Sequence, residues 1–289
     1  MSSSTQQAAL ELVSDFSLEI TGKDLPGLEE ARDLIRHSTR VNITFLGSED
    51  LAVRVDAARA VKAMGFVPVP HIAARRIGSD AELREFLDAL RDVGAVERVF
   101  VIAGDPSKAE GPYPDALSII RTGLLEEYGV TEVGIAGYPE GHPDIAKDVL
   151  WQHLDDKLIE LDRRGLDSVI LTQFGFDTAP VVDWVTAVRS RGHQTPIRIG
   201  VPGPAGVKRL LGFARRFGVG ANAMIVKKYG FSLTNLMGTA GPDRFVDELA
   251  KDLAAADAAA GVGIHMYTFG GMRPTADWVR KFVASRSAA

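Results

Sequence analysis

Eight short runs rich in β-branched residues recur along the 289-residue chain, separated by stretches with helical periodicity. The runs occupy residues 16–20, 41–46, 67–72, 98–103, 132–137, 168–173, 197–201 and 263–268. Several runs are almost continuously apolar, as strands covered on both faces are. Eight strands that alternate with helices, without a long linker, predict a single (βα)₈ TIM barrel over residues 1–289.

Three of the intervening stretches have clear helical patterns. In residues 81–93 an apolar stripe runs from Leu83 to Val93, and Asp80 with Glu82 predicts a capped start. Residues 145–164 carry a similar stripe that begins at Val149 and ends before Gly165. Residues 243–259 are alanine-rich and acidic, which also favours a helix. The gap before the last strand is long, so we expect an extra helical segment there, roughly at residues 219–242.

A doubly wound open sheet is the second fold that this alternation allows. Such a sheet commonly opens with a glycine-rich turn between its first strand and helix. Here the first strand ends in SLEITGKD, and the motif G-x-G-x-x-G is absent from the chain. The sequence therefore favours the closed barrel.

Charge and cysteine content exclude several classes of function. The net charge of -5 and the absence of a basic stripe argue against a nucleic-acid partner. The chain has no cysteine, which excludes disulfides, thiolate metal sites and cysteine nucleophiles. The start of the chain does not resemble a secretory signal, and no apolar run is long enough to span a membrane. We expect a cytoplasmic protein.

Polar side chains stand at the carboxyl ends of most of the predicted strands, which is where barrels of this type carry their chemistry. They are Glu19, Thr44, His71, Asp105, Tyr138, Glu140, His142, Gln173, Asp177, His265 and Tyr267. Each has a structural alternative: Asp105 before a proline is often a turn former, and a histidine between apolar residues is often structural. We expect at most one of His265 and Tyr267 to point inward, and we assign Tyr267 to the site.

Two kinds of hydrolase are weaker interpretations of this ring. A metal hydrolase would use His71, His142, Asp105 and Asp177 as ligands, but neither an H-x-H pair nor H-E-x-x-H occurs. A Ser-His-Asp hydrolase lacks its G-x-S-x-G turn. Neither alternative therefore has a positive spacing signal.

The segments at the strand ends carry a family resemblance. GIAGYPEGHPD at 134–144 resembles a G-x-A-x-Y-P-E-x-H-P signature, and ILTQFGFD at 170–177 resembles I-T-Q-x-x-F-D. Weaker matches are FSLEI at 16–20, VPHI at 69–72, AGDP at 103–106 and HMYT at 265–268. In this order, over nearly the whole chain, they resemble methylenetetrahydrofolate reductase, a flavin-dependent barrel enzyme.

The resemblance implies reduction of 5,10-methylenetetrahydrofolate to 5-methyltetrahydrofolate with NADH or NADPH. Glu19 matches the family's general acid, and we expect burial to raise its pKa. Asp105 matches the aspartate that stabilises the cationic intermediate and binds the folate. Gln173 and Tyr267 match folate-binding positions. The cofactor-binding positions are Thr44, His71, Gly104, Tyr138 and His142.

Departures from the family pattern concern the flavin. Ala103 stands where the family has arginine, and Leu161 where it usually has lysine, and both cations serve the phosphate half of the flavin in the family. Gly175 replaces a usual aromatic residue. Because charge-assisted contacts are strong, we expect weak or absent FAD and direct hydride transfer from the nicotinamide. Arg75, Arg76 or Lys108 are candidate substitutes for the missing cations.

Two alternatives stay open at this point: an FAD-dependent reductase of the usual type, and a folate- or flavin-binding barrel without reductase activity. We expect the folate and the nicotinamide nucleotide as small-molecule partners, with no nucleic acid and no membrane. In the extra segment, Lys227 and Lys228 either bind the folate tail or form a solvated basic pair, and the pair is favoured.

Overall fold

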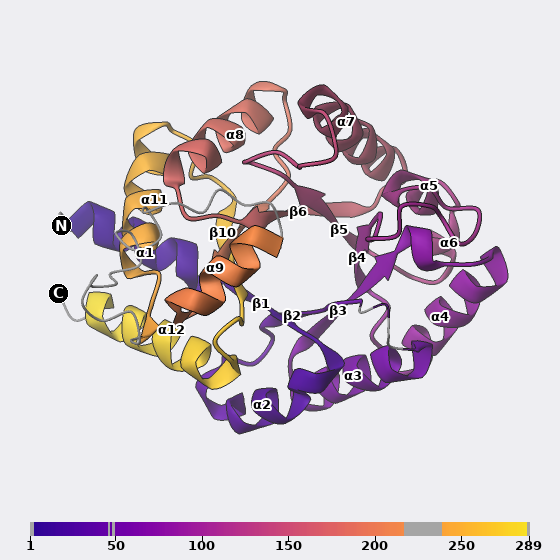
Figure 1. The fold of residues 1–289 in the computed structure, drawn as a ribbon, viewed down its shortest axis with the longest axis horizontal. Helices are drawn as coiled ribbons and strands as arrows, with labels where there is room; N and C mark the ends of the chain where they lie inside the picture. The colour runs from indigo at the N-terminus through magenta and orange to yellow at the C-terminus, as the bar shows by residue number, and fades with distance from the viewer. Residues whose placement is uncertain (1–2, 46, 48–49, 217–238, 288–289) are drawn as a thin grey trace.

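Eight parallel strands close into a barrel in the order β1-β10-β7-β6-β5-β4-β3-β2, with β2 returning to β1 (Figure 1). The computed structural model describes residues 3–45, 47, 50–216 and 239–287. The barrel strands are β1 (Ser17–Ile20), β2 (Arg40–Ile43), β3 (Val67–Ala73), β4 (Arg98–Ile102), β5 (Glu132–Gly137), β6 (Asp167–Phe174), β7 (Ile197–Pro202) and β10 (Val262–Tyr267). Each predicted run overlaps one of these strands, so the barrel prediction is confirmed.

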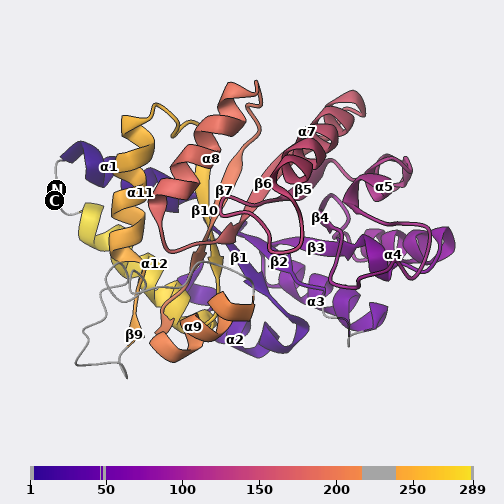
Figure 2. The same ribbon diagram turned by 45° about the horizontal axis from the view of Figure 1, so that its top comes forward.

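The helices lie around the outside of the barrel, apart from α9 (Val207–Arg216), which lies over one end of it (Figures 1 and 2). They are α1 (Ser3–Ser14), α2 (Leu25–Glu30), α3 (Leu51–Ala63), α4 (Asp80–Asp92), α5 (Ala116–Ile120), α6 (Leu124–Glu127), α7 (Lys147–Arg163), α8 (Thr178–Ser190), α9 (Val207–Arg216), α11 (Asp243–Ala255) and α12 (Met272–Ser287). Short 3₁₀ turns are η1 (Gly22–Asp24), η2 (Arg32–Leu34) and η3 (Ala74–Arg76). The predicted helices at 81–93, 145–164 and 243–259 correspond to α4, α7 and α11.

Details of two predicted helices differ from expectation. The N-cap of α4 is Ser79, whose Oγ accepts a hydrogen bond from the Glu82 N–H at 3.2 Å, while Asp80 is already helical. Serine is among the best N-cap residues because its short side chain reaches the free N–H groups of the first turn. In α7, Val149 is 38% exposed and the fully buried stripe begins at Leu154. The first turn of α7 therefore does not pack against the sheet.

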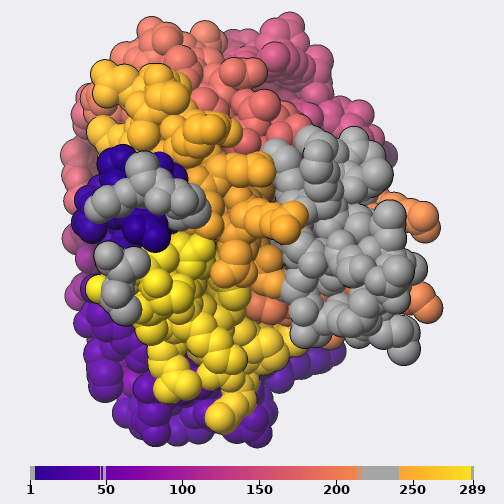
Figure 3. All heavy atoms as spheres, turned by 90° about the vertical axis from the view of Figure 1, so that its left-hand side faces the viewer, coloured from indigo at the N-terminus to yellow at the C-terminus, as the bar shows by residue number. Residues whose placement is uncertain are grey.

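Between β7 and β10 the chain adds α9, α11 and a small antiparallel pair, β8 (Ala205–Gly206) with β9 (Thr239–Ala240). Most of the predicted extra segment 219–242, including Lys227 and Lys228, lies outside the described residues. Figure 3 shows α1 between α11 and α12 on the side of the barrel that carries both termini. None of the helices in the described part of the chain combines the length and the apolar character needed to cross a membrane.

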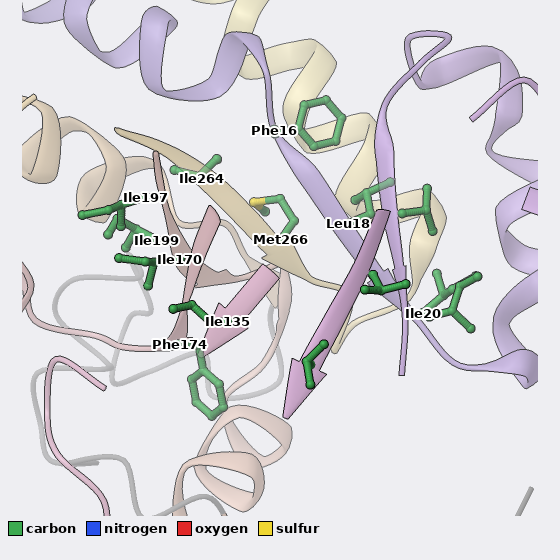
Figure 4. Close-up of a cluster of buried hydrophobic side chains, with 14 of the residues drawn as sticks. Phe16, Leu18, Ile20, Ile135, Ile170, Phe174, Ile197, Ile199, Ile264 and Met266 are labelled. Carbon is green, nitrogen blue, oxygen red and sulfur yellow. The ribbon is translucent and has the colours of Figure 1, made fainter. Parts of the chain in front are cut away.

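The apolar core has two parts. The larger part lies between the barrel and its helices and contains outward side chains such as Leu18, Ile199 and Met266 (Figure 4). A second, small cluster of Val69, Phe100 and Leu171 is separate from the first. These three side chains alternate with outward ones along their strands, so they fill the barrel interior. Polar groups line much of the rest of the interior, and those toward the carboxyl ends of the strands make up the candidate site.

Candidate active site

The register between β1 and β10 brings together the centre of the site. Ser17 pairs with His265, and Glu19 pairs with Tyr267. His265 Nδ1 lies 2.8 Å from Ser17 Oγ, and His265 Nε2 lies 3.7 Å from Glu19 Oε2. Side chains two residues apart on a strand share one face, so both His265 and Tyr267 point into the barrel. The expectation that only one of them points inward is therefore wrong.

Glu19 is held between groups that favour its ionised form. Burial raises the pKa of Glu19, but the contact with His265, the nearby His71 ring and the Thr44 side chain lower it, and the net direction is below its usual value. This is opposite to the direction expected from burial alone. The carboxylate of the free protein is consequently ionised at neutral pH, with 21% of the side chain still open to solvent.

His71 lies on β3 and faces the same interior. Its ring is 4% exposed and stacks obliquely on Phe100 at 4.7 Å, and neither ring nitrogen has a hydrogen-bond partner among the described residues. Burial lowers the pKa of His71 to about 4, although the Glu19 charge opposes this. A neutral imidazole with two unsatisfied nitrogens inside a barrel is costly, because buried polar groups normally have partners. Its nitrogens are thus available to a ligand.

An aromatic wall stands beside Glu19 at the end of β10. The Tyr267 hydroxyl donates a hydrogen bond to the Thr172 carbonyl at 3.1 Å. Burial, together with the charge of Glu19, raises the pKa of Tyr267 well above its usual value, so the phenol stays protonated. The rings of Phe174 and Phe269 contact that of Tyr267 at 5.6 Å and 5.5 Å, and Phe213 of α9 stacks on Phe269 at 3.9 Å. Phe174 is buried, whereas Tyr267 and Phe269 keep partial exposure, so these two rings are the ones that a planar ligand could contact.

Thr44 and Gln173 are two further predicted site residues, at the ends of β2 and β6. The Thr44 N–H donates to the Ile20 carbonyl at 2.8 Å, which ties the end of β2 to β1. Gln173 is half-buried near the end of β6, directly before Phe174 of the aromatic wall. The structure therefore brings Thr44 close to Glu19 and puts Gln173 beside the aromatic wall.

Asp105 follows β4 on the rim, but it is exposed rather than buried. Its side chain is 79% exposed, and Oδ1 accepts two hydrogen bonds from Arg76, from Nε at 2.9 Å and from Nη2 at 2.7 Å. Gly104, directly before it, has φ of +88°, a conformation that favours glycine. The turn therefore aims the Asp105 carboxylate outward, toward Arg76 on η3.

Tyr138 and His142 lie together in the loop after β5. Their rings meet edge to face at 5.5 Å, and His142 Nδ1 accepts a hydrogen bond from the Asp144 N–H at 3.1 Å. This loop borders a hollow of about 1170 Å³ between α7 and α8, lined also by Trp151, Trp184 and Arg191. Glu19 does not line this hollow. The hollow therefore lies to the side of the barrel mouth and not directly over the Glu19 carboxylate.

The positions that differ from the family pattern have structural explanations. Leu161 is a fully buried residue of α7, and a lysine at this position would lose its hydration. Arg75, near Ala103, donates to the carbonyls of Pro114 at 2.8 Å and Pro106 at 3.2 Å. At Gly175, a Cβ atom would lie 2.9 Å from Glu140 Oε1, so an aromatic residue does not fit unless Glu140 moves.

The four residues of the metal-hydrolase alternative do not form a site. Asp177 caps α8, accepting a hydrogen bond from the Ala179 N–H at 3.3 Å, while His142 is engaged within its own loop. Within the described ranges, no three His, Asp or Glu side chains come together as a possible metal site. That interpretation of the strand-end residues has no geometric support.

Several groups at the site were not singled out from the sequence. Ser17 was missed because a serine at the start of a strand carries no signal by itself. Phe174 and Phe269 were within the motif segments or next to them, but only their packing beside Tyr267 reveals a wall. The pairing of Arg76 with Asp105 joins two strand ends that are neighbours in the barrel, so the strand order predicts their closeness but not their contact.

The fold and the site together define a (βα)₈ barrel with a buried carboxylate and two histidines inside its mouth, where such barrels carry their chemistry. A family model described as methylenetetrahydrofolate reductase matches residues 27–269. The chain therefore belongs to the methylenetetrahydrofolate reductase family.

Individual relatives match a shorter stretch. Methylenetetrahydrofolate reductase 2 of Saccharomyces cerevisiae is 27% identical over 139 residues, covering 45% of this chain and 22% of the relative. Methylenetetrahydrofolate reductase (NADH) 1 of Arabidopsis thaliana is 31% identical over 148 residues, or 46% of this chain and 24% of the relative. The protein of the same name from Zea mays is 30% identical over 148 residues. The chain matches less than a quarter of the length of each curated relative.

Proposed function

We propose that this protein reduces 5,10-methylenetetrahydrofolate to 5-methyltetrahydrofolate, taking a hydride from NADH or NADPH. The observation that carries the proposal is the position of Glu19, inside the barrel mouth of a family member, between His265 and His71 and beside the aromatic wall. A ring-opening reduction needs one acid and one flat binding surface, and this end of the barrel offers both.

The reaction begins with a proton transfer from the Glu19 carboxyl group to N10 of the folate. The bond between N10 and the bridging carbon then breaks, which leaves an iminium cation at N5. A hydride from C4 of the reduced nicotinamide adds to that carbon, so the iminium becomes a methyl group and the nicotinamide is oxidised. Glu19, now a carboxylate, takes up one proton from water to complete the balance.

Substrate binding supplies the condition that Glu19 needs in order to act as an acid. The remaining exposure of its side chain would be covered by a pterin ring at the mouth, and further desolvation raises the pKa of a carboxyl group. Asp105 lies on the same rim and, as the cation forms, its negative charge would stabilise it. Gln173 and Tyr267 would hold the pterin against the aromatic wall.

We further propose that the hydride passes directly from the nicotinamide and that FAD is bound weakly or not at all. Charged partners for the flavin's phosphate half are missing at Ala103 and Leu161, and Arg75 is already tied to two carbonyls. These residues do not fit that group, so no step is assigned to a flavin. Thr44, His71, Gly104, Tyr138 and His142 would then line the place of the nicotinamide nucleotide.

The test is an assay of NADH and NADPH oxidation with methylenetetrahydrofolate, together with an absorbance spectrum of the purified protein. We expect folate-dependent oxidation of at least one nucleotide by a colourless protein. A flavin band that survives desalting, with activity that depends on it, would show the usual flavin-dependent reductase instead. Folate binding without oxidation of either nucleotide, with or without added FAD, would leave a binding protein and overturn the proposed activity.

A further inference from the structure

We propose that the exposed face of α9 binds the γ-linked glutamate tail of the folate, with Lys208, Arg209 and Arg215 attracting its carboxylates. The inference rests on the proposed function and deepens it, because it states which form of the substrate is favoured and where its charged end lies. It stands on the position of α9 at the mouth, on the charges of its exposed face, and on the aromatic rings that connect this face to the site.

Helix α9 begins shortly after the carboxyl end of β7 and lies over the end of the barrel that carries the candidate site (Figures 1 and 2). Val207 and Leu210 are buried, which fixes one side of the helix against the core. Phe213 stacks on Phe269 of the aromatic wall at 3.9 Å. The helix therefore forms one side of the mouth, and its other side faces the solvent.

The exposed face of α9 carries positive charge and no negative charge. The helix reads VKRLLGFARR, with four basic residues and no acidic one. Lys208, Arg209 and Arg215 are exposed, and no ion pair joins any of them to a carboxylate of the residues that the structure describes. On α12, by contrast, Arg286 pairs with Asp247 at 2.7 Å. The charges of α9 are therefore available to an anion from solution.

Three exposed positions of α9 form one stripe along the helix. Lys208, Gly212 and Arg215 follow each other at spacings of four and three residues, so they lie on the same side. A Cβ atom at Gly212 would meet no atom of the surrounding structure within 4 Å, so the space between the two cations is open. The two cationic positions are about 10 Å apart along the helix axis. An extended chain with carboxylates at intervals can therefore lie along this stripe.

The chemistry of the substrate directs its tail to the same helix. In the proposed reaction Glu19 protonates N10 of the folate, and the aryl ring is bonded to N10, so this ring begins beside Glu19. Tyr267 pairs with Glu19 in the strand register and contacts Phe269 at 5.5 Å. Phe269 in turn stacks on Phe213 of α9. An aryl ring that lies along these rings brings the glutamate to α9, where its carboxylates stay in water.

The charge of the whole chain makes a local cationic surface useful for this substrate. The net charge is -5, so the average field of the protein repels an anion. Each γ-linked glutamate adds one free carboxylate, and α9 attracts a longer tail more strongly. An exposed ion pair strengthens binding roughly two- to fivefold, so three together should favour a long tail about ten- to a hundredfold.

The main experiment measures by calorimetry how the full chain binds tetrahydrofolate with one glutamate and with five. We expect the pentaglutamate to bind about ten- to a hundredfold more tightly at low salt. In the triple variant Lys208→Gln, Arg209→Gln and Arg215→Gln this advantage should disappear, while the affinity for the monoglutamate changes no more than a few fold. Equal affinity of the unaltered protein for both forms, or an advantage that survives in the triple variant, overturns the proposal.

A pair of substitutions at Gly212 tests charge at one position. Gly212→Glu introduces a carboxylate between the cations, whereas Gly212→Gln introduces a neutral side chain of the same size into the same open space. We expect the glutamate variant to bind the pentaglutamate roughly fivefold more weakly than the glutamine variant. Equal affinities of the two variants would mean that the tail does not lie on this stripe, and the proposal would fall.

A control variant separates this surface from a general effect of net charge. Arg121→Gln, Lys251→Gln and Lys281→Gln together remove the same charge from exposed positions on other elements, and the pentaglutamate should keep its advantage. Loss of the advantage in both triple variants overturns the site on α9. Raising the salt from about 0.05 M to about 0.5 M should shrink the advantage in the unaltered protein, because salt screens exposed charges. An advantage that does not respond to salt contradicts the proposal.

Steady-state kinetics separate the tail from the nucleotide and the inference from the proposed function. In the α9 triple variant the loss should appear in KM for the pentaglutamate substrate rather than in kcat. A change confined to KM for NADH or NADPH would assign the cations to the phosphates of the nucleotide and overturn the proposal. If the binding advantage depends on α9 but neither nucleotide is oxidised, the proposed function fails and this inference stands. If reduction proceeds equally well with either tail length, only this inference fails, and if neither folate binds, both fail.

Discussion

The two ends of the barrel differ in whether their partly buried polar groups have partners within the protein. At the amino ends of the strands, Arg198 donates to Asp15 Oδ2 at 2.6 Å, and Glu132 lies between Arg40 at 3.1 Å and Arg98 at 3.7 Å. Each of these charges has an opposite partner. At the mouth, by contrast, neither nitrogen of His71 has a hydrogen-bond partner in the described part of the chain, and Glu19 is surrounded by two neutral histidines, Thr44 and Tyr267.

This contrast separates what holds the barrel together from what it is used for. A charge cluster with internal partners needs nothing from outside, and it closes one end of the barrel. Polar groups that remain unsatisfied inside a fold lower its stability, and they persist where a ligand completes them. The mouth is therefore the end at which a substitution can cost activity without costing stability, and the amino end is where the reverse is expected.

Glu19→Gln should have the largest effect of the substitutions considered, and this effect should fall on turnover and not on folate binding. The amide keeps the size of the side chain but has no proton to give to N10, so we expect kcat to fall by about 10²–10⁴-fold while folate still binds. Turnover in the NADH or NADPH assay and folate binding by calorimetry measure the two quantities. Unchanged kcat would refute the role of Glu19 as the acid.

Glu132→Gln is the matched substitution at the other end. It removes the shared partner of Arg40 and Arg98, whose side chains are only 28% and 31% exposed. We expect the free energy of unfolding to fall by about 2–4 kcal/mol, somewhat less than for a fully buried pair. Denaturant unfolding measures this, and kcat per folded molecule should not change. Equal losses of activity in both Glu→Gln variants would erase the difference between the two ends.

His71→Phe should raise stability at the mouth while lowering activity. The substitution replaces two unpartnered nitrogens by carbon next to Phe100, which we expect to stabilise the protein by about 1–3 kcal/mol at neutral pH. If His71 binds the nucleotide, KM for that nucleotide should rise at the same time. A less stable variant would mean that the His71 ring has an internal function in the fold.

The same position predicts a pH dependence of stability. The pKa of His71 is lowered from 6.5 to about 4. Between these pH values His71 is therefore protonated in the unfolded chain and neutral in the folded protein. Stability from this group is complete above pH 6.5 and is lost as the pH falls toward 4, a difference of roughly 3 kcal/mol. Unfolding curves of the unaltered protein and of His71→Phe should therefore diverge with falling pH, and parallel curves would contradict the buried neutral state.

The sequence predicted the barrel better than it predicted the site, for a physical reason. Strands covered on both faces are read directly from their apolar runs, so all eight strands were found. Helix α1 was not predicted, although Leu12 and Val13 are buried, since part of its helical stretch is polar and resembles a flexible tail. The approach of Ser17, Glu19 and His265 depends on the register between β1 and β10, which joins residues almost a full chain length apart.

The environment of Glu19 was the part of the site that the sequence predicted least well. Burial was expected to raise its pKa, and the net lowering comes from His265, His71 and Thr44, which lie on three other segments. The sequence could have predicted that His265 and Tyr267 point the same way, because side chains two residues apart share a face of a strand. The contact of His265 with Ser17 could not be predicted in the same way, because it depends on the register between β1 and β10, which is a property of the assembled sheet.

Arg76→Gln should have the smallest effect. It tests an ion pair at the mouth that can be compared with the ion pairs at the amino ends of the strands. Arg76 pairs with Asp105 much as Arg198 pairs with Asp15, but Asp105 is 79% exposed, so water already screens its charge. We expect a loss of under about 1 kcal/mol in the free energy of unfolding and a change in kcat of no more than a few fold. Asp105→Asn, in contrast, should lower kcat clearly with the same small change in stability, because the proposed role needs the carboxylate charge itself, which would turn from Arg76 toward the forming cation when the folate binds. Equal losses of kcat in both variants would show that the ion pair acts as one unit, with Arg76 holding Asp105 in place for the reaction.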